Sequence, residues 1–347
     1  MRRYQCTVSY VGALYEGWQS QGRGTSVQEV IEEVLHRITQ EDIKIMGSGR
    51  TDAGVNAGGQ VFSFYTEREM TCRKWMGAIN GYLPKDIHIM KVEEAPRFFH
   101  VRYNVRYKQY DYRIDMNDYN VFAKDYAYQI PLVLDTDAMR KAIPYLIGTH
   151  DFTSYNSSPL KEFPDQVRTV FDIKMTVEGS RITLSFIGKG FLRYMVRMMA
   201  GTLVEVGRHK IEPEDVKRIL EEKSKTAHRK CAPANGLTLE YVDYFEVPAL
   251  SEEAEVREFL FDDELPEGMN IKEIEESVKK NLFPRFYVLV KRHEMKRLGH
   301  FIADRNGSSL VIYNKAYQQT AEELIPALSD WCKEKGINEQ VTIISQE

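Results

Sequence analysis

Cysteine is scarce in this sequence. The 347 residues include only four cysteines, and no two of them form a CxxC pair. This spacing argues against a disulfide framework and against a cysteine-based zinc site, because both need cysteines at short, paired intervals. A reducing cytoplasm is therefore the expected location. The four are Cys6, Cys72, Cys231 and Cys332.

Long apolar runs are absent as well. No stretch comes close to the roughly 18 apolar residues that a membrane-spanning helix needs, and the basic N-terminus MRRYQCTVSY is not followed by the apolar segment of a signal peptide. The chain also lacks two common nucleotide-binding patterns, GxGxxG and GxxxxGK followed by Ser or Thr, and its histidines show no metal-ligand spacing. We expect a globular protein with no membrane contact, no organic cofactor and no metal.

The net charge of −4 is small but unevenly distributed. Residues 251–347 contain 13 lysines and arginines against 19 aspartates and glutamates, whereas the first 250 residues contain 34 against 32. An acidic C-terminal region therefore masks a slightly basic main body. The low overall charge does not argue against a nucleic-acid partner for that body.

Two similar successions of strands and helices are predicted from the apolar patterns of the main body. The first has strands at 3–10, 43–46, 61–65, 87–92 and 106–114 and helices at 27–38 and 71–83. The second has a helix at 137–146, strands at 168–177 and 181–187, and a helix at 191–206. This order predicts an α+β fold of two pseudo-duplicated halves with antiparallel sheet and flanking helices, although no repeated sequence proves a duplication.

Domain boundaries follow from the same patterns. Residues 1–115 and 116–248 are expected to form the two halves of a core, which ends where Pro248 is followed by the acidic stretch 252–267. Residues 249–347 are then a small accessory α/β module. Its predicted helices lie at 271–281 and 321–335, and its strands near 286–290, 299–303, 310–313 and 341–345.

The glycine-rich run GSGRTDAGVNAGGQ at 47–60 is the first candidate for a functional site. It places Arg50 two residues before Asp52, among glycines that let a large ligand approach the backbone. An arginine can bind an anion, and the nearby aspartate can act as a nucleophile or a base. The alternative is a plain glycine-rich turn in which both side chains pair with their neighbours.

This run resembles the signature of the tRNA pseudouridine synthase A family, GRTDAGVHA followed by GQ. The resemblance implies a pseudouridine synthase-like core and a cofactor-free isomerisation of uridine to pseudouridine in the anticodon arm of tRNA, at tRNA positions 38–40. It also implies a homodimer with the tRNA touching both subunits. Matching segments extend over residues 1 to about 245: GWQSQ, TSVQEVIEEVL, YLPKDI, FFHVRYNVRYKQYDYRI, GTHDFTSY, GKGFLRYMVRMMAGTLVEVGR and CAPANGLTL.

The resemblance assigns three residues to catalysis. Asp52 matches the catalytic aspartate, which must be ionised to act at the sugar, so a cation that lowers its pKa is expected nearby. Arg197, in RYMVRMM, matches the arginine that pairs with it. Tyr110, in YKQYDY, matches the active-site tyrosine, which can stack on uracil or transfer a proton. Taken alone, Arg197 could equally be a surface charge of a helix, and Tyr110 a packing residue of a strand.

Five further residues are predicted to bind the RNA. Leu237, in NGLTL, matches a family leucine that packs under the base, although alone it is typical of a core residue. Arg106 and Lys108 lie where basic and aromatic residues alternate, which suits RNA but also a half-buried strand with a solvated basic face. Arg50 would hold the phosphate of the flipped nucleotide or the space that its base vacates. Lys189, in GKG before a helix, would bind a phosphate or simply form a turn.

The sequence departs from the family pattern at Asn56, where histidine is usual, and at Met198, where asparagine is usual. SKTAHRKCAPA also replaces a polar DR…AG stretch. These departures leave the target uridines open. A paralogue that modifies a different RNA, a tRNA-binding or folding factor with secondary catalysis, and a hydrolase that combines Asp52 with a second carboxylate are the alternatives.

The accessory module lies outside the resemblance. Its one basic cluster falls between two predicted strands and is expected to be a loop. RNA contact through this loop, a surface for a partner protein and a stabilising appendage are three possible roles. The isolation of the cluster in an acidic region favours a modest role in choosing the RNA. The cluster consists of Lys291, Arg292, His293, Lys296 and Arg297.

Overall fold

The computed structural model describes residues 2–20, 25–95, 101–102, 105–227 and 229–244 with their side chains. Farther along the chain it describes the backbone of strands at 254–258, 285–291, 296–303, 308–312 and 341–345, and scattered residues between 322 and 340. The chain forms two compact units: residues 1–95 with 105–244, and residues 96–104 with 245–347. No helix in the described part of the chain is long and apolar enough to cross a membrane.

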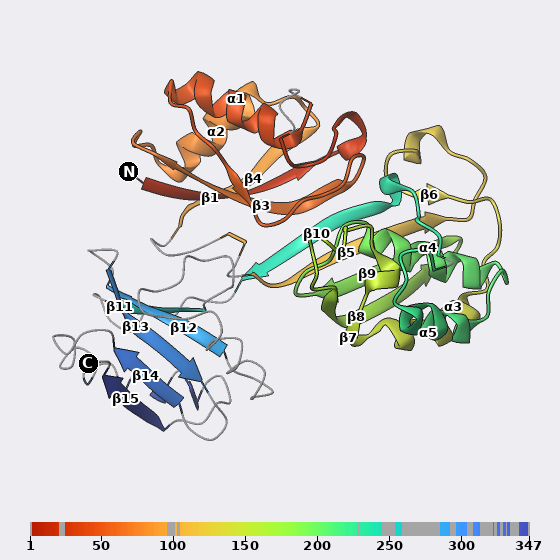
Figure 1. Ribbon diagram of the computed structural model, residues 1–347. Helices are drawn as coiled ribbons and strands as arrows, with labels where there is room; N and C mark the ends of the chain where they lie inside the picture. Colours follow the sequence, from red (N-terminus) through yellow and green to blue (C-terminus); the bar gives the residue numbers. More distant parts are fainter. Residues whose placement is uncertain are drawn as a thin grey trace. The chain divides into compact units, whose positions relative to one another are not determined.

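A ten-stranded mixed sheet runs through the first unit (Figure 1). Its strand order is β4-β1-β3-β10-β5-β9-β8-β7, with β2 paired to β3 and β6 paired to β5. The strands are β1 (Arg2–Tyr10), β2 (Met46–Gly47), β3 (Asn56–Thr66), β4 (Ile87–Glu94), β5 (Val105–Asp115), β6 (Tyr128–Gln129), β7 (Gly148–Asp151), β8 (Val167–Glu178), β9 (Arg181–Gly188) and β10 (Leu237–Tyr244).

Strand β10 joins two similar halves into this one sheet. It is the last strand of the unit, yet it lies between β3 and β5, parallel to β3 and antiparallel to β5. Together with the parallel pair β5–β6, it makes the sheet mixed where an antiparallel one was predicted. The sequence patterns had also given no strand at 237–244. The α+β class and the two flanked halves are as predicted.

Two helices cover the first half, α1 (Val27–Thr39) and α2 (Cys72–Tyr82). Both lie on the same side of β1, β3 and β4 (Figure 1). The predicted helix start is confirmed, because Ser26 and Glu29 form a capping box at the beginning of α1. Trp75 of α2 packs against Tyr4 of β1 and Phe64 of β3, and the ring centroids of the three side chains lie 5.3–5.5 Å apart. Such a cluster fixes the sheet that carries the loop at 48–55.

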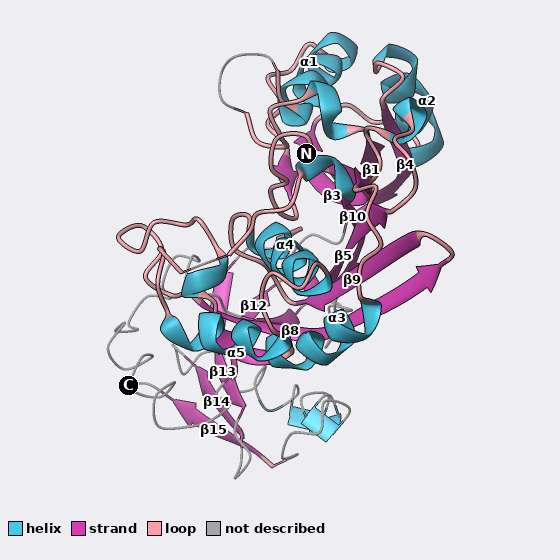
Figure 2. Ribbon diagram, turned by 90° about the vertical axis from the view of Figure 1, so that its right-hand side faces the viewer, coloured by secondary structure: helices cyan, strands magenta, loops and turns pink. Residues whose placement is uncertain are grey.

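Three helices accompany the second half: α3 (Thr136–Ala142), α4 (Met195–Gly207) and α5 (Pro213–Glu222). They pack together next to β5, β8 and β9 (Figures 1 and 2). Helix α4 is buried along most of its length, as its apolar sequence requires. It begins at Met195 rather than at residue 191 as predicted, because Tyr194 takes a left-handed backbone conformation with φ of 62°.

The second unit contains a five-stranded sheet of order β11-β12-β13-β14-β15. Neighbouring strands are antiparallel except for β14 and β15. The last four strands are close to the predicted ones, whereas β11 lies in the acidic stretch that was taken as a boundary. The predicted helix at 271–281 lies outside the described residues. The strands are β11 (Ala254–Glu258), β12 (Arg285–Lys291), β13 (Lys296–Ala303), β14 (Ser308–Ile312) and β15 (Val341–Ser345).

Candidate active site

Asp52 lies in the loop that connects β2 to β3. Backbone hydrogen bonds tie this loop to the segment that follows β1: Trp18 N donates to Thr51 O over 3.2 Å, and Gly54 N donates to Tyr15 O over 3.3 Å. Within the loop, Val55 N donates to Asp52 O over 3.1 Å. These bonds give the aspartate a fixed backbone although it belongs to no helix or strand.

Gly17 allows the loop of Asp52 to pack closely against the segment after β1, because glycine has no side chain. Its φ of +94° is a conformation that residues with a Cβ rarely adopt. A Cβ at this position would lie 2.6 Å from Thr51 O and 3.1 Å from the carbonyl carbon of Asp52. The sequence patterns did not single out Gly17. Its place in the matching segment GWQSQ was the only signal.

Buried polar side chains support the loop from the sheet. Tyr10 Oη lies 2.8 Å from Thr51 Oγ1, and Gln60 Nε2 donates to Gly49 O over 3.0 Å. Lys108 Nζ, on β5, donates to Ser48 O over 2.7 Å, and only 9% of this lysine is exposed. The structure therefore places Lys108, predicted as an RNA ligand, beneath the loop of Asp52.

Arg197 brings the second half to Asp52. In the first turn of α4, its Nη1 lies 3.4 Å from Asp52 Oδ2, and the two side chains are only 16% and 20% exposed. Its Nε donates to Ala232 O over 2.8 Å, and Ala232 N donates back to Arg197 O over 3.0 Å. The guanidinium also lies over the ring of Tyr194, 4.9 Å from its centroid. Arg197 is thus fixed on three sides and directs one nitrogen at the carboxylate.

Two opposing effects act on the pKa of Asp52. Burial raises this pKa and is the larger effect, while the charges of Arg197 and then Arg193 lower it. The net pKa is above the ordinary value for aspartate. The expected depression by Arg197 is present, but the sequence alone did not show that burial would exceed it, because burial depends on the tertiary packing.

Tyr110 is the third residue that was expected here. It lies on β5, is 8% exposed, and packs edge-on against Phe191 with the ring centroids 5.4 Å apart. Burial raises the pKa of its phenol, and the charges of Tyr10 and Asp52 raise it further. Tyr110 is therefore a neutral phenol near Asp52.

Leu237 and Asn56 are both buried where the halves meet. Leu237 begins β10, directly opposite Tyr112 on β5. Asn56 Oδ1 accepts a hydrogen bond from Gly12 N over 2.8 Å, and its Nδ2 donates to the backbone carbonyl of Asp125 over 2.7 Å. At the position where the family usually has histidine, Asn56 thus links the segment of Gly12 to that of Asp125 by hydrogen bonds. Met198, the other departure, is buried in α4.

The remaining predicted RNA ligands lie at exposed positions. Arg50 is exposed two residues from Asp52, and Lys189 is exposed in the turn after β9. Arg106 forms an ion pair with Asp243 of β10, and its side chain is about half exposed. The structure brings Asp52, Arg197 and Tyr110 together, with Lys108 under the loop, and does not show Arg106 in contact with them.

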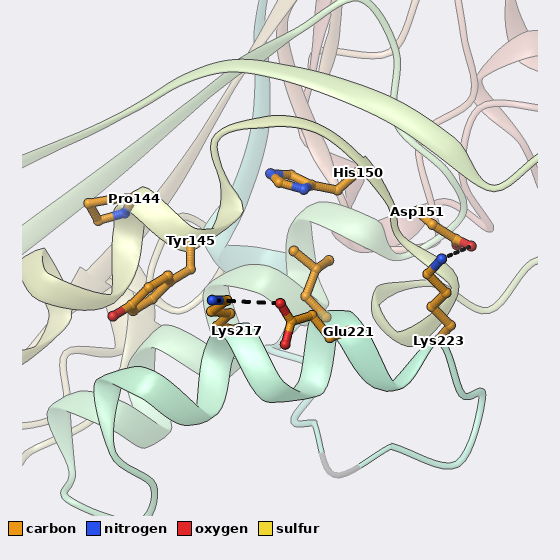
Figure 3. Close-up of a pocket in the computed structure, with 8 residues that line it drawn as sticks. Pro144, Tyr145, His150, Asp151, Lys217, Glu221 and Lys223 are labelled. Atoms are coloured by element: carbon orange, nitrogen blue, oxygen red, sulfur yellow. Dashed lines mark ion pairs between the residues drawn. The ribbon is translucent and has the colours of Figure 1, made fainter.

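Neither a surface hollow nor a metal-binding group adds to this site in the residues that the structure describes. A surface hollow of about 280 Å³ on the second half contains none of the predicted site residues (Figure 3). Its charged side chains pair with each other, Lys217 with Glu221 and Lys223 with Asp151. Within the described part of the chain, no group of three or more histidine, cysteine, aspartate or glutamate side chains is arranged to hold a metal ion.

Both halves of the first unit match a known protein family. Residues 7–104 and 142–245 match a protein-family model described as tRNA pseudouridine synthase. One family model thus covers both halves of the first unit. The chain belongs to the tRNA pseudouridine synthase family, which consists of isomerases.

Individual relatives agree with this assignment. A tRNA pseudouridine synthase A of Brevibacillus brevis is 43% identical over 245 residues, which are 70% of this chain and 100% of the relative. The protein of the same name from Anoxybacillus flavithermus is 40% identical over 245 residues, 70% of this chain and 99% of the relative. A tRNA pseudouridine synthase A 1 of Bacillus cereus (strain ATCC 10987) is 41% identical over 246 residues, again 70% of this chain and 99% of the relative.

Proposed function

We propose that this protein isomerises uridine to pseudouridine in the anticodon arm of tRNA, at positions 38–40, with Asp52 as the catalytic residue. The observation that supports it most is the Asp52–Arg197 ion pair, which joins the two halves next to the neutral phenol of Tyr110. We infer tRNA as the substrate from the names of the relatives, and positions 38–40 from the sequence resemblance. The homodimer and the cytoplasmic location stay predictions.

The chemistry needs one ionised carboxylate. Asp52 acts at the sugar as nucleophile or base, the C1′–N1 bond breaks, the uracil turns, and C1′ bonds to C5. C5 then loses its proton and N1 gains one, so the product is an isomer of the substrate. Arg197 keeps the carboxylate ionised against the effect of burial. Tyr110 and Leu237 are the proposed contacts of the base.

A hydrolase mechanism is less well supported. Glycosidases combine two carboxyl groups, one as acid and one as nucleophile or base. The charged side chains that act on Asp52 in the described structure are both arginines, Arg197 and Arg193. Release of free uracil from the RNA would indicate hydrolysis, whereas an isomerase releases none.

Asp52→Asn tests the assignment. The variant should fold, bind an unmodified tRNA transcript with the affinity of the wild type, and form no pseudouridine, because an amide neither attacks C1′ nor acts as a base toward the sugar. Asp137→Asn, at an exposed position of α3, is the matched control and should keep full turnover. Pseudouridine is measured by mapping the transcript after reaction. Substantial turnover by the Asp52→Asn variant would refute the proposal.

A further inference from the structure

Arg193 is an exposed arginine beside Asp52 that the sequence patterns did not single out. It lies in the turn between β9 and α4, four residues before Arg197. Its guanidinium lies over the ring of Tyr194, the same ring that Arg197, the partner of Asp52, lies over. In keeping with this position, its charge lowers the pKa of Asp52. A cation at the open side of a buried carboxylate is well placed to meet an anionic ligand there.

The position of Arg193 is fixed by its surroundings. Ser157 N donates to Arg193 O over 3.0 Å, and Arg193 N donates to Ser158 Oγ over 3.4 Å. The guanidinium lies over the ring of Tyr194, 5.0 Å from its centroid, and Nη2 donates to Tyr194 Oη over 3.4 Å. Stacking on an aromatic ring orients a guanidinium while leaving its edge open for hydrogen bonds.

Tyr194 couples this arginine to the site. Its ring also lies under Arg197, so both guanidinium groups are about 5 Å from one ring centroid. Its backbone φ of 62° is unusual for a residue with a side chain, and such conformations concentrate at functional sites. The strained residue sets the direction of both arginines at the start of α4.

Four other basic residues of the unit are bound to groups of the protein itself. Arg197 pairs with Asp52, and Arg113 and Arg106 pair with carboxylates of β10. Lys108 is bound to the backbone of Ser48. In the described part of the chain, Arg193 has no carboxylate within ion-pair distance, and its polar side-chain contact is the Tyr194 hydroxyl. Its charge is therefore available to a ligand.

We propose that Arg193 binds a backbone phosphate of the RNA strand next to the nucleotide that Asp52 engages. The planar guanidinium suits two phosphate oxygens, and the tyrosine behind it reduces the freedom that it loses on binding. This subsite rests on the proposed function. It would hold the strand in register while the target base turns, and it does not take part in the bond changes.

The test compares Arg193→Gln and Arg193→Lys with a matched control, Arg37→Gln. Arg37 is also an exposed arginine over a tyrosine ring, with its Cζ 4.3 Å from the centroid of Tyr82, but it lies on α1. The substrate is an unmodified tRNA transcript at pH 8, far above the ordinary pKa of an aspartate, so that a change in the pKa of Asp52 affects the comparison least. Glutamine should raise KM about tenfold with kcat nearly unchanged, because it removes one charge-assisted hydrogen bond to the substrate.

Salt dependence identifies the ligand as a phosphate. RNA affinity is measured in the Asp52→Asn background over a range of salt concentrations. Loss of one phosphate contact should lower the slope of log K against log salt by about 0.7–0.9. Arg193→Lys should keep most of the slope, because it keeps the charge, and Arg37→Gln should match the wild type.

Three results would overturn the subsite: an unchanged KM in Arg193→Gln, a raised KM with an unchanged salt slope, or a loss in kcat alone. The last would make Arg193 a residue that acts only through Asp52. Thermal melting of each variant checks that it is folded. If Arg193→Gln is not folded, the test of the subsite rests on the KM and salt slope of Arg193→Lys. Turnover by Asp52→Asn would instead refute the proposed function and leave the salt result standing.

Discussion

At the scale of single residues, the pKa of Asp52 reflects two opposing effects, that of burial and that of two nearby arginines. Burial favours the neutral acid, whereas Arg197 and Arg193 favour the carboxylate. The chemistry requires the carboxylate. If Asp52 acts as proposed, burial narrows the pH range of activity from the acid side, and the two arginines extend that range toward lower pH.

Arg197→Met should therefore move the acid limb of the pH–rate profile to higher pH. Without its largest opposing charge the pKa of Asp52 rises further, so a smaller fraction is ionised at acid pH, while the rate well above this pKa changes less. Arg197→Lys keeps the charge but loses the planar fork, and should give partial activity. The measurement is kcat/KM against pH.

Arg208→Met is the control for that experiment. Arg208 lies at the other end of α4, where it pairs with Glu205 over 3.3 Å. Its removal should leave the acid limb unchanged. An acid limb that stays in place in the Arg197→Met protein would show that the arginine does not hold the ionisation of Asp52.

The sequence indicated some of these residues and not others. A recognisable motif surrounds Asp52, Tyr110 and Arg197, and the structure brings all three together. Gly17 and Arg193 belong to loops, and their importance arises from a close approach and a stacked ring that only the folded chain creates. Lys108 was predicted to contact RNA, whereas its ammonium group binds the buried carbonyl of Ser48. A strand pattern in the sequence does not reveal such a contact.

At the scale of elements, the loop of Asp52 depends on the segment after β1. Gly17→Ala should reduce turnover well beyond its effect on folding, because the new methyl group displaces the backbone of Thr51 and Asp52. The positive φ alone costs about 1–2 kcal/mol for alanine. Thermal melting measures the effect on stability, and kcat on a tRNA transcript measures the displacement.

Gly179→Ala separates the two contributions. Gly179, between β8 and β9, has a φ of +60°, and an added Cβ would meet nothing within 4 Å. It shares the unfavourable conformation but not the clash, so it should lower stability by a similar backbone cost and keep turnover. Equal kcat losses in both variants would count against a specific role for Gly17.

Element boundaries were predicted where local chemistry sets them. The start of α1 was predicted at Val27, and the structure confirms it, with a capping box of Ser26 and Glu29 at this end. The start of α4 was placed too early, because the apolar pattern continues through 191–194 while Tyr194 breaks the helix by its backbone conformation. Strand β10 was missed although TLEYVDY has a strand-like composition, since its partners β3 and β5 are far away in the sequence.

At the scale of the whole molecule, the accessory module is an addition to the family core. The family match ends at residue 245, and relatives matched over 245 residues are covered almost completely. Those relatives carry the family name without a matching extension. The second unit is therefore expected to modify the choice or the affinity of the RNA rather than to supply the chemistry.

The basic cluster of the module lies at the β12–β13 hairpin. Lys291 ends β12 and Lys296 begins β13, and the two residues are partners in the strand register. Arg292 and His293 between them lie outside the described residues. The sequence places four lysines and arginines within positions 291–297 of an otherwise acidic region, and the predicted RNA contact rests on this cluster.

Reversing this charge should weaken RNA binding modestly. With Lys291, Arg292, Lys296 and Arg297 changed to Glu, we expect KM for a tRNA transcript to rise roughly two- to fivefold and the salt slope to fall, because we expect the whole cluster to supply a single surface charge contact of about 0.5–1 kcal/mol. Lys333→Glu, at an exposed position of the same unit, is the control and should behave as the wild type. A chain that ends at residue 248 should show the same KM change as the charge-reversed protein, since both lose the hairpin contact. If both proteins instead modify the same uridines at the wild-type rate and salt dependence, the module has no RNA role, and its acidic composition is better explained by a partner protein.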